Sequence, residues 1–171
     1  MNTVIINSDD MELPSWSEKA GDFSKKVLDI RKRKNWELSI LFCGDKKIKE
    51  LNHQYRNKNE ATDILSFSLG ETIINGGKKT YIPGDIVISL DTLRRNAEYF
   101  KISADEELRR LLIHGILHLD GMDHKTLKKI EPMLALQEEI LEKLKDTAII
   151  PEGDLLCADA DTKRFPAGGE N

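Results

Sequence analysis

Three of the four histidines in the chain lie close together, at His114, His118 and His124. On an α-helix His114 and His118 are one turn apart on the same face, so both imidazoles can reach one cation. Gly121 tolerates a positive φ at the helix end, which lets the chain fold back and bring His124 to the same point. The spacing therefore predicts a site in which three nitrogens hold one metal ion.

The ligand set indicates the metal and its chemistry. Imidazole ligands favour one Zn²⁺ ion, although Ni²⁺ or another divalent ion also binds such a set. Three protein ligands leave one coordination position for water, as in catalytic zinc sites. A metal held in this way lowers the pKa of bound water and polarises a carbonyl or phosphoryl oxygen. Hydrolysis is therefore the expected reaction class.

The spacing HxxxHxxGxxH is also that of the metzincin proteases, in which a glutamate directly follows the first histidine and serves as general base. Gly115 occupies that position here. A zincin-like metallopeptidase is therefore the weaker alternative. No carboxylate is placed beside the metal by its spacing, so the sequence names no general base.

The elements that must position these histidines follow an α/β order of strand, turn and helix. Four short runs predict strands, at residues 4–7, 37–42, 64–69 and 81–89. Five stretches with apolar residues at helical spacing predict helices, at residues 15–33, 45–56, 91–100, 103–119 and 132–145. Ser103 and Glu106 form a capping box, and Pro132 predicts a break near Glu131. Asn75 to Gly77 is typical of a hairpin turn, and Pro83 with Gly84 favours an exposed sheet edge.

Length and composition limit the architecture. A chain of 171 residues and 19.5 kDa, with 39% hydrophobic and 33% charged residues, is expected to fold as one domain. Residues 1–150 are interpreted as a single metallohydrolase-like domain, and 151–171 as a mobile acidic tail that carries most of the net charge of −4. No segment suits a membrane span or a secretory signal, so we expect a cytoplasmic protein without a membrane partner.

Three sequence blocks resemble the YbeY family of ribosomal RNA maturation endoribonucleases. HGILHLDGMDH at 114–124 follows the family's histidine signature, and NHQYR at 52–56 with TDILSF at 62–67 follows a second block. GDI at 84–86 is similar to a third, and the resemblance extends over about residues 36–141. Met122 stands where the family usually has an aromatic residue. Three further residues depart from the family's pattern without touching a proposed ligand: Asn59, Ala61 and Pro132.

The resemblance implies a zinc-dependent, single-strand-specific endoribonuclease. Its expected partners are single-stranded RNA, the 3′ end of 16S rRNA and the small ribosomal subunit, with a further role in quality control of the 70S ribosome and no DNA substrate. It also implies an α/β (α+β) fold, with a small mixed sheet of about four strands, about five helices and the metal-binding helix packed on the sheet.

Arg56 is the candidate catalytic residue beyond the metal ligands. Cleavage of a phosphodiester needs a cation to offset charge on the phosphoryl oxygens, which a planar guanidinium does well. Its position at a helix end alone favours a solvated charge, and the resemblance favours the catalytic role. Asp63 and Asp85 are candidates to orient a metal-bound water or a ligand histidine, and turn capping is the alternative for both. Glu107 shares the helix face of His114 and suits either capping or support of the site.

Two further interpretations stay open. A non-enzymatic ribosome assembly factor would use the zinc to stabilise its fold, so metal removal would cost stability without any RNA cleavage. Cationic side chains are candidates to line an RNA path, and a solvated face is the alternative. They are Lys25, Lys26, Arg31, Lys32, Arg33, Lys34, Lys46, Lys47 and Lys49. His53 is expected to be a solvated histidine.

Overall fold

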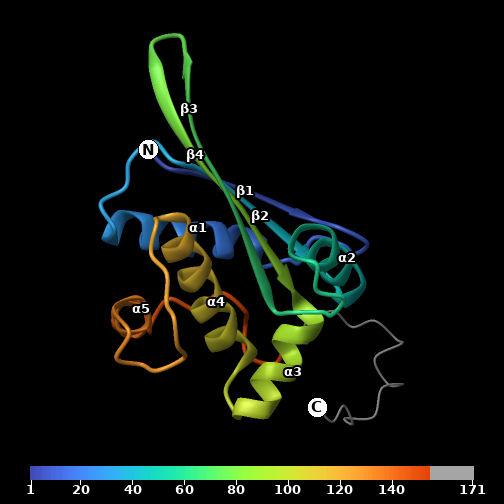
Figure 1. The fold of residues 1–171 in the computed structure, drawn as a ribbon. Coiled ribbons are helices and arrows are strands. Elements are labelled where there is room, and N and C mark those ends of the chain that lie inside the picture. The colour runs from blue at the N-terminus through green and yellow to red at the C-terminus, as the bar shows by residue number, and fades with distance from the viewer. Residues whose placement is uncertain (155–171) are drawn as a thin grey trace.

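The computed structural model describes residues 1–154, so residues 155–171 of the predicted tail lie outside it. Within that range the chain forms four strands and five helices (Figure 1). The strands are β1 (Thr3–Ser8), β2 (Glu37–Cys43), β3 (Ile64–Asn75) and β4 (Lys78–Ser89). The helices are α1 (Ser17–Ile30), α2 (Asp45–Arg56), α3 (Leu90–Phe100), α4 (Ala104–Leu119) and α5 (Pro132–Lys143). None of these helices is long and apolar enough to cross a membrane.

The four strands form one mixed sheet in the order β1-β2-β4-β3. β1 pairs with β2 in parallel, and β2 pairs in parallel with β4. β3 runs antiparallel to β4 at the other edge, because a two-residue turn at Gly76 and Gly77 joins the two strands. The predicted mixed α+β fold is therefore confirmed.

Alternation along the inner strands divides the core between the two sheet faces. Ile86 and Ile88 of β4 are fully buried in the main cluster, together with residues of α1 and α4. Val87 points to the other face, where it packs with Cys43 and with Ile48 of α2. The large cluster thus lies beneath α4, the helix that carries two of the histidines.

α4 lies very close to the sheet at Gly115. A Cβ at this position would lie 2.8 Å from Cδ1 of Ile86 and 3.0 Å from Cδ1 of Ile64. Glycine therefore lets the helix axis approach the strands, as predicted for a metal-binding helix packed on the sheet. At the start of the helix, the Ser103 hydroxyl accepts a hydrogen bond from the Glu106 amide at 3.0 Å, as the capping box predicts.

The prediction that Pro83 and Gly84 mark a sheet edge is wrong, because β4 is an inner strand. The pairing of β3 with β4 is irregular between Ser68 and Glu71, and Pro83 lies opposite this irregularity. A bulge tolerates a residue without an N–H. Gly84 has a φ of 138°, and a Cβ there would collide with the carbonyl oxygen of Phe67. The two residues therefore mark a β-bulge.

Beyond the bulge the β3–β4 hairpin continues as an arm past the other strands (Figure 1). Every residue of β3 from Ser68 to Asn75 is exposed. Gly76 and Gly77 at the tip have φ values of 57° and 80°, as the hairpin turn predicts. Both strands are longer than predicted, because the exposed residues near the tip have no alternating pattern to extend the prediction.

Candidate metal centre

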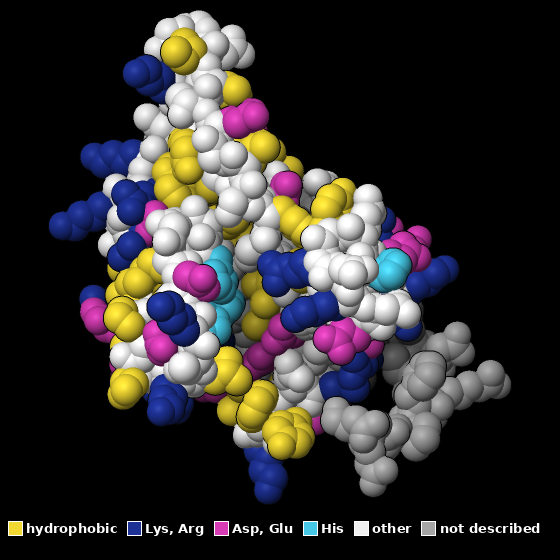
Figure 2. All heavy atoms as spheres, in the orientation of Figure 1, with side chains coloured by type: hydrophobic (Ala, Val, Ile, Leu, Met, Phe, Trp, Pro, Cys, Tyr) yellow, Lys and Arg dark blue, Asp and Glu magenta, His cyan; other side chains and the backbone are white. Residues whose placement is uncertain are grey.

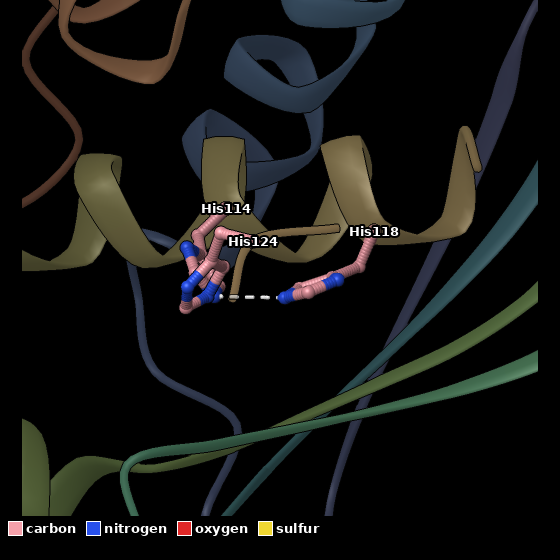
Figure 3. Close-up of side chains that lie close together, drawn as sticks. All are labelled: His114, His118 and His124. Atoms are coloured by element: carbon pink, nitrogen blue, oxygen red, sulfur yellow. Dashed lines mark hydrogen bonds between the residues drawn. The ribbon is translucent and has the colours of Figure 1, made fainter. Parts of the chain in front are cut away.

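The three histidines predicted as ligands lie together, although they come from two kinds of element. His114 and His118 lie one turn apart on α4, and His124 comes from the loop that follows (Figure 3). Gly121 has a φ of 90° and reverses the chain between them. One ring nitrogen of each histidine lies within 4.8 Å of one nitrogen of each of the others. The Nε2 atoms of His114 and His118 are 3.1 Å apart.

Each histidine places its other ring nitrogen, Nδ1, against an oxygen acceptor. The pairs are His114 with Gln137 Oε1 at 2.7 Å, His118 with the Met122 carbonyl at 3.1 Å, and His124 with the Thr126 carbonyl at 2.9 Å. A carbonyl oxygen only accepts hydrogen bonds, so Nδ1 of each ring carries the hydrogen. Each neutral imidazole therefore has its lone pair on Nε2, and the oxygens fix the ring orientations.

The protonation of the cluster also favours a cation. Burial lowers the pKa of His114 and of His118, and the proximity of the two rings lowers the pKa of His118 further. Both rings are thereby kept in the neutral form that binds metals. Neutral Nε2 atoms that face one another at 3.1 Å have no hydrogen to share. The donor set therefore fits one divalent ion bound at about 2.0–2.1 Å from each nitrogen.

A cavity of about 620 Å³, the histidine cavity, opens beside the cluster. Its lining includes the three histidines, Arg56, Asp63 and Ser66. Figure 2 shows the histidines along one side of a hollow, with Lys or Arg side chains across it. Arg56 is the last residue of α2, is exposed, and donates a long hydrogen bond of 3.5 Å to the Ser66 carbonyl. The structure thus brings the predicted catalytic arginine to the cavity of the predicted ligands.

The two candidate aspartates have different locations. Asp63 lines the histidine cavity, and Nδ2 of Asn96 donates a hydrogen bond of 3.2 Å to its carboxylate. Asp85 lines a separate cavity with Tyr55 and Phe67. It lies one residue before Ile86, so strand alternation turns its side chain to the face opposite α4. The interpretation of Asp85 as a partner of a ligand histidine is therefore wrong.

Asp120 holds the end of the metal-binding helix in place. It follows α4 directly, and its side chain is 2% exposed. Nε of Arg31 donates to one carboxylate oxygen at 2.7 Å, and Nε of Arg33 donates to the other. Two of the cations considered for an RNA path thus have an intramolecular partner. Lys47 also pairs with Asp9, at 3.4 Å. His53 is exposed, as expected.

Gln137 is a site residue that the residue patterns alone did not single out. It lies on α5, is 6% exposed and contacts His114 across the interface between α4 and α5. In the sequence, the resemblance of the last helix to the family was the only indication that Gln137 belongs to the site.

Gly115 is the position at which metzincins hold their glutamate, and its close contact with Ile86 leaves no room for such a side chain. This packing removes support from the metallopeptidase alternative.

Comparisons with known proteins agree with the motifs. The model of a family described as Endoribonuclease YbeY matches residues 4–145. A Treponema denticola protein named Endoribonuclease YbeY is 46% identical over 129 residues, which span 75% of this chain and 83% of that protein. A Treponema pallidum protein of the same name is 42% identical over 142 residues, spanning 82% and 89%. A solution structure of a Thermotoga maritima protein is similar with a TM-score of 0.59 and 25% identity, covering 84% of this chain and 91% of that one.

Proposed function

The chain belongs to the YbeY family of endoribonucleases, and we propose on this basis that it is a zinc-dependent, single-strand-specific endoribonuclease. Its proposed substrate is the 3′ end of 16S rRNA on the small ribosomal subunit, with a further role in quality control of the 70S ribosome. A ribosomal substrate would place the protein in the cytoplasm. Residues 1–150 are proposed to act as one metallohydrolase-like domain.

The observation that carries the proposal is the set of three inward Nε2 atoms beside an arginine. His114, His118 and His124 would hold one zinc ion, because each has its Nδ1 occupied by an oxygen. The bound ion would supply a Lewis acid that polarises a phosphoryl oxygen and lowers the pKa of water. Other divalent ions that accept imidazole ligands would bind the same set.

Arg56 is proposed to bind the scissile phosphate. Its guanidinium lines the histidine cavity and makes one hydrogen bond, of 3.5 Å, within the described residues. Most of its five N–H donors are therefore available to phosphoryl oxygens. Such a contact grows stronger as negative charge develops on those oxygens, which favours the transition state over the bound substrate.

The decisive experiment is cleavage of a labelled single-stranded RNA that carries the 16S rRNA 3′ end. Zinc-loaded protein is compared with a chelated sample and with His118→Ala, all purified identically to control for contaminating nucleases. We expect only the loaded wild type to cut. Arg56→Ala is expected to lose about 100-fold to 1,000-fold in cleavage rate.

The same experiment tests the assembly-factor alternative. If none of the three samples cuts the RNA while chelation lowers the melting temperature, the zinc is structural and the assembly-factor alternative is favoured. Equal cutting by all three would contradict metal-dependent nuclease activity. Arg56→Ala with full cleavage rate and full RNA affinity would contradict the role of the arginine alone. A duplex of the same sequence is the matched substrate, and equal cleavage of both would contradict single-strand specificity.

A further inference from the structure

A second cavity, the side pocket, adjoins the metal centre on the side of α5. Its volume is about 560 Å³, within the range of about 300–1,000 Å³ that is usual for small-molecule sites. Asp63, Ile64, His114 and His124 line both cavities, so the two share a wall. A nucleotide with its phosphate at the histidines therefore has the side pocket within reach of its base.

Glu107 places a carboxylate, an acceptor of hydrogen bonds, in the wall of this pocket. Its side chain is 7% exposed and lines the pocket. Among residues 1–154 its carboxylate has one side-chain partner, Nη1 of Arg110, which forms an ion pair with it at 3.9 Å. Arg110 itself is held by Glu138 at 2.9 Å and by Glu106 at 3.3 Å. A carboxylate that lines a pocket and has only one partner, at 3.9 Å, can accept hydrogen bonds from a ligand that enters the pocket.

Apolar side chains form much of the remaining lining. Leu134 is 9% exposed on α5, whereas Phe100 and Leu127 are 60% and 86% exposed. Exposed large apolar side chains beside an acceptor suit a flat, partly apolar ligand with donors on one edge. An unstacked nucleobase has this character, and single-stranded RNA presents such bases.

We propose that the side pocket binds a guanine base of the RNA next to the scissile phosphate, and that Glu107 determines this specificity. The identification of the ligand as RNA rests on the function proposed above. Guanine presents N1–H and an N2 amino hydrogen side by side, which match the two oxygens of one carboxylate. Adenine and cytosine place an acceptor nitrogen beside their amino group, and uracil places carbonyl oxygens on both sides of its N–H. Those acceptors would face the carboxylate and weaken binding.

Binding of mononucleotides tests the proposal without any cleavage. The full-length protein, labelled at leucine and isoleucine methyl groups, is titrated with GMP, AMP, CMP, UMP and IMP and followed by NMR. We expect GMP to shift the resonances of Leu127 and Leu134 and to bind at least about 10-fold more tightly than AMP, CMP or UMP. IMP lacks only the N2 amino group of GMP, and we expect about 10-fold weaker binding. The phosphate is common to all five, so the differences report on the base.

Two variants assign the effect to the carboxylate. Glu107→Gln keeps the shape but replaces one acceptor with a donor, so GMP should lose its preference to within about twofold of AMP. Glu98→Gln makes the same charge change at an exposed residue of α3 and should keep the preference. Equal affinities for GMP and IMP in the wild type would overturn the proposal, as would a guanine preference that survives Glu107→Gln. Selective GMP binding by a protein that cuts no RNA would contradict the nuclease function and support the pocket.

Discussion

The metal centre and the junction between α2 and α3 are both clusters of polar side chains near the end of an element. In the junction, Asp45 accepts hydrogen bonds from Ser89 at 2.7 Å, from Thr92 at 2.6 Å and from Arg95 at 2.6 Å. Its own amide donates to Asp91 at 2.9 Å. In the metal centre, by contrast, only the outer nitrogen of each ring meets an oxygen.

The difference separates a cluster that stabilises the fold from one that binds a ligand. The junction satisfies its polar atoms within the protein, so it joins two helix N-termini and needs nothing further. The metal centre uses protein oxygens to orient three rings and directs the remaining nitrogens at one another. A polar cluster that is satisfied on its outer side and unsatisfied at its centre therefore indicates a binding site.

Removing a ligand should have the largest effect and should leave the fold intact. We expect His124→Ala to lower zinc affinity about 1,000-fold, because about 10–16 kcal/mol of zinc binding energy is shared among few ligands. Competition with a fluorescent chelator measures the affinity. The free energy of unfolding of the metal-free protein should change by less than about 1 kcal/mol, because His124 lies in a loop. A zinc affinity within tenfold of the wild type would contradict its role as a ligand.

Removing the junction carboxylate should lower the stability of the fold and leave zinc affinity almost unchanged. We expect Asp45→Ala to lower the free energy of unfolding by about 3 kcal/mol, since three donors, one of them charged, lose their acceptor. Zinc affinity should stay within about twofold of the wild type. Urea denaturation measures the stability. Asp22→Ala is the matched control, because its exposed carboxylate pairs only with Lys25 within residues 1–154, at 3.4 Å, and is worth less than about 1 kcal/mol.

Gln137 supports the site without being a ligand, so its substitution should lower zinc affinity less than removal of a ligand does. Gln137→Leu keeps the volume but removes the acceptor of the His114 Nδ1 hydrogen. We expect zinc affinity to fall about 10-fold to 100-fold. Gln54→Leu, on the exposed face of α2, should leave it unchanged. An unchanged affinity in Gln137→Leu would show that helix packing alone orients His114.

Acid should weaken the junction gradually. Burial raises the pKa of Asp45, but hydrogen bonds from Thr92, Ser89 and Arg95 outweigh this and hold the pKa below its ordinary value of 3.8. A carboxyl with a lowered pKa contributes stability above its ordinary pKa and loses it as the pH falls through the folded value. The stability difference between wild type and Asp45→Asn should therefore be constant above about pH 5 and shrink below about pH 3.5. A difference that grows on acidification would contradict this assignment.

The parts that could be predicted from the sequence depend on short separations along the chain. The spacing of His114, His118 and His124 needs only helix geometry and one glycine turn, and the structure brings the three together. The number and order of strands and helices followed from local periodicity in the same way. Arg56 needed the family resemblance, because its position alone indicates a solvated helix end.

The parts that could not be predicted depend on tertiary packing. Gln137 reaches His114 only because α5 packs on α4, and nothing near Gln137 in the sequence encodes that contact. Asp120 meets Arg31 and Arg33 across nearly ninety residues of chain. The side of the sheet that Asp85 faces follows from the register of an inner strand, which the isolated strand sequence does not specify.

The exposed arm of the β3–β4 hairpin has a practical consequence for handling the protein. Neither Gly76 nor Gly77 at its tip has a neighbouring atom within 4 Å of a Cβ position. Loop tips of this kind tolerate inserted residues, because lengthening a surface turn costs little free energy. A short peptide tag inserted between the two glycines would tether the molecule to a surface by its arm. The histidine cavity would stay open to solution.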